Sequence, residues 1–258
     1  MLVEFIERLR VVKPLTISIV GAGGKTTLLI ELAYLLPGLV ISTTSTKLVT
    51  ETALLFEWQA QLDGKLPDSN LFRGPQVKNI LITDHSFEKD GIKKLEGLTP
   101  DQLVTLNRIC YQNNATLLIE ADGARHRQLK APAGWEPVIP EFSDLVIYVI
   151  GTEGIGKPLN EDNVFRSEIF ASLTESKLEA PVQPDMIARY LQHPLGGQKG
   201  IPENANKILL ITQTNFDSAK TDVYQSLANQ MKGYFDAIFI ASFGLGRQYH
   251  YIKSQRLL

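Results

Sequence analysis

The sequence is short of cysteine, of excess charge and of long apolar runs. Cys110 is the single cysteine, which rules out a disulfide within the chain and fits a reducing compartment. The 26 basic and 28 acidic residues nearly balance, so neither nucleic acid nor an anionic membrane surface is an expected partner. No apolar run approaches the length of a membrane span. These features together predict a cytoplasmic protein.

The first residues, MLVEFIERLRVV, also lack the features of a signal peptide. Acidic residues interrupt them, and they contain no uninterrupted apolar core followed by a small-residue cleavage site. Apolar residues at helical spacing instead predict a short helix over residues 2–9, which Pro14 ends.

Apolar residues make up 44% of the 258 residues, enough to bury a large core. Short apolar runs rich in β-branched residues alternate with helical patterns along the chain. Because strands buried on both faces form such continuous apolar runs, the pattern predicts an α/β fold with a largely parallel sheet. The predicted strands start near Leu15, Leu39, Asn79, Ala115, Leu145, Lys207 and Ala237.

Helical patterns occur between these runs. Thr99 and Pro100 suit the N-cap and the first position of a helix that continues to about Asn113. Residues 153–203 are richer in proline, glycine and charge, and they predict an inserted helical lobe within one domain of residues 1–258. A charged, glycine-containing stretch after Thr83 is typical of a hairpin. Further helices are predicted over residues 26–36, 48–62 and 218–232.

A glycine-rich stretch, VGAGGKTT, follows the first predicted strand. It is a shortened form of the phosphate-binding loop G-x-x-x-x-G-K-[ST], because Ile19 stands where that pattern has its first glycine. Glycines allow successive N–H groups to converge on a phosphate, and the N-terminus of the next helix adds positive potential. A nucleotide-binding loop is therefore predicted over Gly21, Ala22, Gly23, Gly24, Lys25, Thr26 and Thr27.

The alternative is that the three glycines only form a turn between a strand and a helix. A plain turn gives no reason for a lysine at the helix N-terminus, where positive charge opposes the helix dipole. Lys25 can instead reach the terminal phosphates, and the Thr26 hydroxyl can bind Mg²⁺. The loop and its setting therefore predict a three-layer P-loop NTPase-like fold that binds ATP or GTP with Mg²⁺.

In an open parallel sheet, ligands bind at the carboxyl ends of the strands. Glu120 and Asp122 end the apolar run LLIEAD, and both point to one face because they lie two residues apart. This resembles the acidic strand end that holds Mg²⁺ in P-loop NTPases, although the strand could also simply end there. In STTSTKL, after the second strand, Thr44 is a candidate for contact with Mg²⁺ or phosphate and Lys47 for contact with an anion. A polar loop is the simpler alternative there.

Basic residues follow the same edge. Arg125, Arg127 and Lys130 come just after the acidic strand end, and Lys157 and Arg166 follow the next predicted strand. They could bind a γ-phosphate or an anionic substrate through charge-assisted contacts. A basic run is more often a solvated face, so both interpretations stay open.

The stretch TQTN, at the end of a later strand, stands where guanine-specific GTPases have N/T-K-x-D. Gln213 replaces the lysine and Asn215 replaces the aspartate. Both amides could contact a base, but guanine selectivity is not predicted without the carboxylate. We therefore expect Gln213 and Asn215 to bind the nucleotide, which is either ATP or GTP.

Several stretches together resemble the selenium-dependent hydroxylase accessory protein family, YqeC. They are VGAGGKTT, STTSTKL, LLIEADGARHRQLKAPAGWEPVIP, IGKPLNEDNVFR and TQTN, and they span nearly the whole chain. The resemblance implies a cytoplasmic P-loop protein associated with selenium-dependent molybdenum hydroxylases. Its partners would be such a hydroxylase or its cofactor-delivery proteins. The resemblance also implies nucleotide-site roles for Lys25, Thr26, Glu120 and Asp122.

Three activities fit these features. The first is NTP hydrolysis that drives delivery of a cofactor or metal to a client enzyme, with Lys25, Glu120 and Asp122 as the catalytic residues. The second is an ATP-dependent ligase or kinase acting on an anionic small molecule, because the shortened loop also resembles that of Mur-type ligases. The third is a regulator that binds nucleotide without hydrolysing it. Phe165 stands where many family members have a histidine, so no chemistry is assigned to a histidine there.

Overall fold

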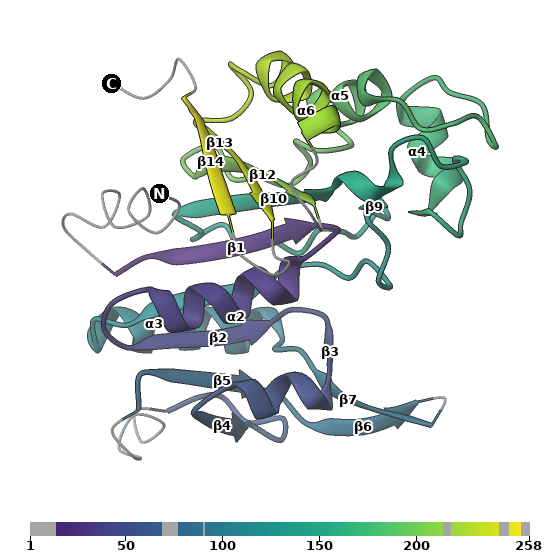
Figure 1. The fold of residues 1–258 in the computed structure, drawn as a ribbon. Helices are drawn as coiled ribbons and strands as arrows, with labels where there is room; N and C mark the ends of the chain where they lie inside the picture. Colours follow the sequence, from purple (N-terminus) through teal and green to yellow (C-terminus); the bar gives the residue numbers. More distant parts are fainter. Residues whose placement is uncertain (1–13, 69–76, 90, 214–217, 243–247, 254–258) are drawn as a thin grey trace.

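The computed structural model describes residues 14–68, 77–89, 91–213, 218–242 and 248–253 (Figure 1). For residues 213, 218–221 and 248–253 only the backbone is described. The helix predicted over residues 2–9 and the predicted base contact Asn215 lie outside the described residues. In the part of the chain that is described, no helix has the length and apolar character needed to cross a membrane.

A nine-stranded sheet forms the centre of the molecule, in the order β14-β13-β12-β10-β1-β8-β2-β5-β4 (Figure 1). Neighbouring strands are parallel except that β14 runs antiparallel to β13. The predicted, largely parallel α/β sheet is thus confirmed, and each predicted strand belongs to it. Its strands are β1 (Thr16–Gly21), β2 (Val40–Thr44), β4 (Trp58–Gln61), β5 (Asn79–Thr83), β8 (Thr116–Glu120), β10 (Leu145–Gly151), β12 (Asn206–Gln213), β13 (Ala237–Ser242) and β14 (Gln248–Lys253).

Helices cover both faces of this sheet, which confirms the predicted three layers (Figure 1). One face packs against α2, whose Leu28 is fully buried in one core cluster. The other face packs against three helices, and Leu106 and Leu227 lie in that second cluster. Strands covered on both faces bury every side chain, which explains their continuous apolar runs. The helices are α2 (Lys25–Leu35), and then α3 (Pro100–Gln112), α5 (Pro184–Gln192) and α6 (Ser218–Gln230).

The start of α3 agrees with the prediction. Thr99 is the N-cap, and its hydroxyl accepts a hydrogen bond from the Gln102 N–H at 3.3 Å. The Gln102 side chain accepts one from the Thr99 N–H at 2.8 Å, which completes a capping box. Pro100 occupies the first turn, where its missing N–H has no cost.

The helix predicted over residues 48–62 is wrong. This segment contains β3 (Lys47–Val49), the 3₁₀ helix η1 (Thr50–Leu55) and β4. β4 pairs with β5 in the central sheet, and β3 pairs with β7 (Ile92–Glu96). Periodicity over short apolar runs does not separate strand from helix, and here long-range strand pairing decides the structure. β7 also forms the predicted hairpin with β6 (Ser86–Lys89).

The segment between β10 and β12 contains the predicted helical insertion. Its elements are η3 (Thr152–Gly154), β11 (Val164–Phe165), α4 (Ser167–Leu173) and α5. β11 pairs in parallel with β9 (Leu129–Lys130), which follows β8. Phe170 and Ile187 are fully buried in the same core cluster as Leu106 of α3. The inserted segment therefore shares the core of the sheet on this face.

Candidate functional site at the carboxyl edge of the sheet

The glycine-rich loop joins the end of β1 to the start of α2. Gly21, Gly23 and Gly24 have φ values of +94°, +83° and +122°, a region that other residues rarely adopt. A Cβ atom on Gly21 would lie 2.1 Å from the Val149 carbonyl oxygen. The Ala22 N–H donates to that oxygen at 2.8 Å. Both the conformation and the close approach to β10 therefore require glycine at position 21.

Lys25 begins α2 and is only 5% exposed. Its Nζ donates to the Gly21 carbonyl oxygen at 2.8 Å. It also lies 3.4 Å from Asp122 Oδ1 and 3.8 Å from Glu120 Oε1. A buried ammonium group needs such partners, because burial of an unpaired charge is costly. The three residues predicted to form the catalytic group are thus brought together.

Further hydrogen bonds hold the two carboxylates. Thr26 Oγ1 donates to Glu120 Oε2 at 2.9 Å, and the Gly21 N–H donates to Asp122 Oδ2 at 3.1 Å. Thr44 lies beside them, with its Oγ1 donating to the Glu120 carbonyl oxygen at 2.9 Å. Burial raises the pKa of Glu120, while Lys25 and the hydrogen bond from Thr26 act in the opposite direction.

Asp122 has one oxygen that remains available. Its Oδ1 is buried and accepts no hydrogen bond from the described residues. A buried carboxylate oxygen without a donor is unusual, and here it lies beside Lys25 and Glu120. Two carboxylates and a threonine hydroxyl are ligands that Mg²⁺ uses together with phosphate oxygens. The residues present therefore fit a magnesium ion bound with a nucleotide.

The helix N-terminus fits a phosphate. The first helical hydrogen bond runs from the Leu28 N–H to the Gly24 carbonyl oxygen at 2.9 Å. The N–H groups that precede it at a helix start have no helical acceptor, and they carry partial positive charge. Gly21 and Gly23 pack closely against β10, where a Cβ atom would lie 2.1 Å from the Val149 carbonyl oxygen and 2.5 Å from Gly151. The helix start thus has the donors of an anion-binding site.

Lys130 and Arg166, both predicted to bind an anion, contact a carboxylate that the sequence analysis did not assign. Lys130 is 2% exposed, and its Nζ lies 3.0 Å from Asp122 Oδ2 and 2.8 Å from Glu136 Oε2. Arg166 binds Glu136 through both guanidinium nitrogens, at 2.7 and 3.1 Å. The only signal for Glu136 was its place in the stretch WEPVIP. Anion binding by Lys130 and Arg166 stays a prediction.

The other predicted anion ligands lie farther out. Arg125 is exposed, and its guanidinium lies 5.0 Å from the ring centroid of Phe165. Arg127 donates to the Glu161 carbonyl oxygen at 2.8 Å, and Lys157 is exposed. Lys47 pairs with a carboxylate on β7, 3.3 Å away. None of these contacts tests whether the side chains bind an anion.

The predicted base contacts are also untested. Gln213 ends β12, but its side chain is not described, and Asn215 lies outside the described residues. The preceding residue, Thr212, donates through its hydroxyl to the Gly23 carbonyl oxygen. The end of β12 therefore contacts the glycine-rich loop, as the prediction requires.

Comparison with known proteins identifies the family of this chain. The model of the family described as YqeC protein matches residues 17–168. The chain belongs to the YqeC family. It is 33% identical to the uncharacterized protein YqeC of Escherichia coli (strain K12) over 220 residues, which cover 83% of this chain and 81% of the relative. No solved structure gives a significant match.

The residues that the YqeC family model matches include every charged residue that pairs with Asp122 or Glu136. The glycine-rich loop, the carboxylates at the end of β8, Lys130, Glu136 and Arg166 all lie within residues 17–168. β12 to β14 lie beyond this range, although the alignment with the Escherichia coli relative is longer. The family resemblance expected from the sequence is thus confirmed.

A pair on this edge that the sequence analysis missed is Asp84 with His85, just after β5. Asp84 Oδ1 accepts hydrogen bonds from Gln102 Nε2 and from the Gly64 N–H, both at 2.8 Å. Its Oδ2 lies 2.8 Å from His85 Nδ1. The hydrogen bond from Gln102, with smaller contributions from His85 and Gly64, lowers the pKa of Asp84. Because the charged carboxylate only accepts, His85 Nδ1 is the donor.

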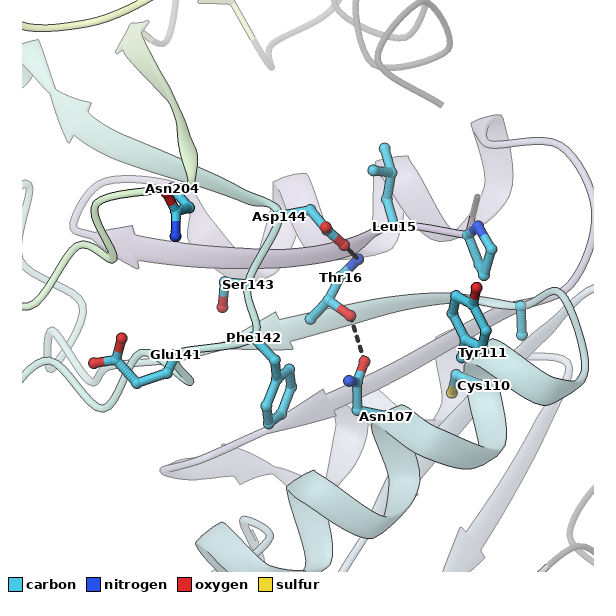
Figure 2. A pocket seen from close by; sticks show the side chains of 12 residues that line it. Leu15, Thr16, Asn107, Cys110, Tyr111, Glu141, Phe142, Ser143, Asp144 and Asn204 are labelled. Carbon is cyan, nitrogen blue, oxygen red and sulfur yellow. Dashed lines mark hydrogen bonds between the residues drawn. The ribbon is translucent and has the colours of Figure 1, made fainter. Parts of the chain in front are cut away.

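A separate cavity of about 390 Å³ lies at the opposite, amino edge of the sheet (Figure 2). It is lined by residues at the starts of β1 and β10 and near the end of α3. Thr16 Oγ1 donates to Asn107 Oδ1 at 2.6 Å there, and the Thr16 N–H donates to Asp144 Oδ2 at 2.9 Å. Since β1 separates this cavity from the glycine-rich loop, it is not part of the carboxyl-edge site.

Proposed function

We propose that this YqeC family member binds and hydrolyses ATP or GTP with Mg²⁺ at the carboxyl edge of its sheet. The observation that supports the proposal is the convergence of Lys25, Thr26, Glu120 and Asp122 beside a glycine-rich helix N-terminus. Thr26 and Glu120, whose side chains share a hydrogen bond, lie 94 residues apart in the sequence. A plain strand-to-helix turn gives no reason for that convergence.

Each residue has a specific role in the proposed reaction. The backbone of residues 23 and 24 and the N-terminus of α2 would bind the phosphates, since the Gly21 and Ala22 N–H groups donate to Asp122 and Val149. Lys25 leaves the carboxylates and neutralises charge on the transferred γ-phosphate. Thr26, Glu120 and Asp122 would hold Mg²⁺, and Thr44 holds the backbone of Glu120 in place. The bound ion would neutralise charge on the β- and γ-phosphates.

Lys25 gives the first test of the nucleotide site. Calorimetry with ATP and with GTP should show that Lys25→Ala loses about 1.5–3 kcal/mol of binding free energy, the range for a charge-assisted hydrogen bond. Glu120→Gln and Asp122→Asn should instead raise the Mg²⁺ concentration needed for hydrolysis. Unchanged affinity in a folded Lys25→Ala protein would contradict the phosphate-binding role. Mass spectrometry of the ligand retained on purification would identify the nucleotide.

The cellular role we propose is maturation of selenium-dependent molybdenum hydroxylases, as cofactor synthesis or insertion. Membership of the YqeC family supports this proposal, together with the resemblance in EADGA, LKAP and GKPL. Among the described residues, no group of three or more His, Cys, Asp or Glu side chains could hold a metal ion. Burial raises the pKa of the Cys110 thiol to about 12, so it is a poor nucleophile. Selenium would therefore arrive on a bound cofactor or partner.

Genetics tests this role. A strain that lacks the gene for this chain should lose activity of a selenium-dependent hydroxylase, and the hydroxylase purified from it should be depleted in selenium. Complementation with Lys25→Ala should fail if nucleotide binding is required. Full hydroxylase activity with normal selenium content in the deletion strain would contradict the pathway, but it would leave the nucleotide site untouched.

A second candidate is a kinase or ligase that acts on an anionic small molecule. The Asp84–His85 pair favours it, because β5 lies two strands from β8 and ends at the same edge. A histidine oriented in this way can accept a proton from an attacking group. Release of ADP or GDP that depends on a small molecule, and that His85→Gln abolishes, would support this candidate over hydrolysis alone. Nucleotide binding without turnover would instead support a regulatory protein.

A further inference from the structure

The buried charges at the carboxyl edge continue beyond Asp122 in an alternating row. Asp122 is followed by Lys130, then by Glu136, and then by Arg166 in the inserted segment. Each neighbour in this row is within 3.0 Å. The four formal charges cancel, which matters most for Lys130 and Asp122, because these two side chains are almost fully buried.

Lys130 is held by three oxygens of the protein. Its Nζ donates hydrogen bonds to Glu136 Oε2 and to the Gly123 carbonyl oxygen, both at 2.8 Å, and it forms an ion pair with Asp122 Oδ2 at 3.0 Å. An anion could bind Lys130 only if one of these contacts broke. The arrangement suits a residue that holds Asp122 in place.

Asp122 is oriented as a result. Its Oδ2 accepts from the Gly21 N–H and forms an ion pair with Lys130, whereas its Oδ1 has no hydrogen-bond donor among the described residues. Rotation of the carboxylate would break this hydrogen bond and this ion pair in a buried position. Only Oδ1 therefore faces Lys25 and the proposed cation site.

Arg166 connects this row to the start of α4. It is the residue before α4, with φ +60° and ψ 54°, and its backbone N–H donates to Glu161 Oε2 at 3.2 Å. Its guanidinium lies 4.2 Å from the Phe165 ring centroid and binds both oxygens of Glu136. Burial raises the pKa of Glu136, but hydrogen bonds from Arg166 and Lys130 outweigh this and leave the pKa below its usual value. Glu136 is thus charged at neutral pH.

We propose that Lys130, Glu136 and Arg166 are positioning residues for the metal-binding oxygen of Asp122. Because Arg166 directly precedes α4, they make metal binding depend on the position of α4. This inference rests on the proposed nucleotide and Mg²⁺ site. It also gives Arg166 a different role from anion binding. Outer partners of metal ligands commonly change metal affinity about 10- to 100-fold when they are replaced.

The test compares Glu136→Gln and Arg166→Gln with the wild type. Nucleotide affinity is measured by calorimetry in EDTA, with ATP and with GTP. Metal affinity is measured with saturating nucleotide by electron paramagnetic resonance of Mn²⁺, used in place of Mg²⁺. We expect both variants to need about 10-fold more Mn²⁺ for half-saturation. Their affinity for nucleotide without metal should stay within about twofold of the wild type, because neither residue touches the phosphates in this proposal.

Asp185→Asn is the matched control. It removes an exposed ion pair with Arg189 at 2.7 Å, in α5 of the same inserted segment, and keeps the hydrogen bond from Arg189 to the Thr174 carbonyl oxygen at the end of α4. This variant should keep the wild-type Mn²⁺ requirement. Arg166→Lys, which can restore one contact with Glu136, should have an intermediate requirement.

The outcomes separate the two proposals. Wild-type protein that binds neither nucleotide overturns the proposed function and this inference together. Wild-type binding with an unchanged Mn²⁺ requirement in both variants overturns the positioning role alone. Loss of metal-free nucleotide affinity in Arg166→Gln would show that Arg166 is an anion ligand instead. If Glu136→Gln does not fold, Arg166→Gln decides, since that side chain is 20% exposed and at the outer end of the row.

Discussion

At the amino edge of the central sheet, the Thr16 and Ser18 hydroxyls pair with neutral side chains, whereas at the carboxyl edge lysines pair with carboxylates. Thr16 bonds to Asn107, and Ser18 lies 2.8 Å from Ser143, both near the cavity at the amino edge. At the other edge, Lys25 and Lys130 lie against Asp122 with side chains at most 5% exposed.

This difference shows that the carboxyl edge costs more free energy to bury than the amino edge. A hydrogen bond between neutral groups roughly compensates for the hydrogen bonds to water that both groups lose on burial. A buried ion pair, in contrast, often stabilises a fold no more than apolar residues of the same volume. A large group of buried charges therefore points to a role beyond stability. The cavity of about 390 Å³ lies at the amino edge (Figure 2), but the carboxyl edge carries the ionic chemistry.

The largest expected effect on stability comes from Lys25→Met. This substitution leaves Glu120 and Asp122 close together without their common cation, and breaking a buried ion pair costs about 3–5 kcal/mol. Burial raises the pKa of Glu120 and Lys25 opposes this, so without Lys25 the folded protein would hold a proton on Glu120 more tightly than the unfolded chain, and stability should fall as the pH rises from 5 to 8. Urea unfolding at both pH values measures this. A loss of unfolding free energy below about 1 kcal/mol at both pH values would contradict the proposed difference between the two edges.

A smaller effect is expected for Glu136→Gln. Because the pKa of Glu136 is lowered in the folded protein, its charge stabilises the fold above the pKa of an unfolded glutamate, about 4.3. That contribution is lost as the pH falls through the folded pKa. The variant should therefore be about 1–3 kcal/mol less stable at pH 7, the cost of losing hydrogen bonds to a charged group. The difference between the two proteins should shrink towards pH 3, and a constant difference would argue against a charged Glu136.

The smallest effect is expected at the amino edge. Thr16→Val keeps the shape of the side chain and removes its hydrogen bond to Asn107, which should cost about 1 kcal/mol of unfolding free energy. Thermal unfolding measures the loss, and calorimetry should show the same nucleotide affinity as the wild type. Weaker nucleotide binding in Thr16→Val would mean that the two edges are coupled.

Much of the fold was predictable from local patterns. Apart from the edge strand β4, the strands of the parallel sheet are largely apolar runs, and α3 has a capping box that can be recognised in four residues. The loop at Gly21 to Lys25 was predictable for a similar reason, since its glycines and lysine are adjacent in the chain. The approach of Glu120 and Asp122 to that loop followed from the general rule that carboxyl ends of parallel strands share an edge.

Only the tertiary structure decided the rest. Residues 48–62 resembled a helix, but pairing with β5 and β7 makes two short strands of them. The sequence shows no partner for Lys130 or Arg166. In the folded chain both form ion pairs with Glu136, which lies 30 residues before Arg166. A local pattern shows which charges a segment carries, but it does not show which partner a fold will place against them. The sequence by itself therefore determined the sheet, the glycine-rich loop and the acidic strand end, and long-range packing determined how the charges around them are shared.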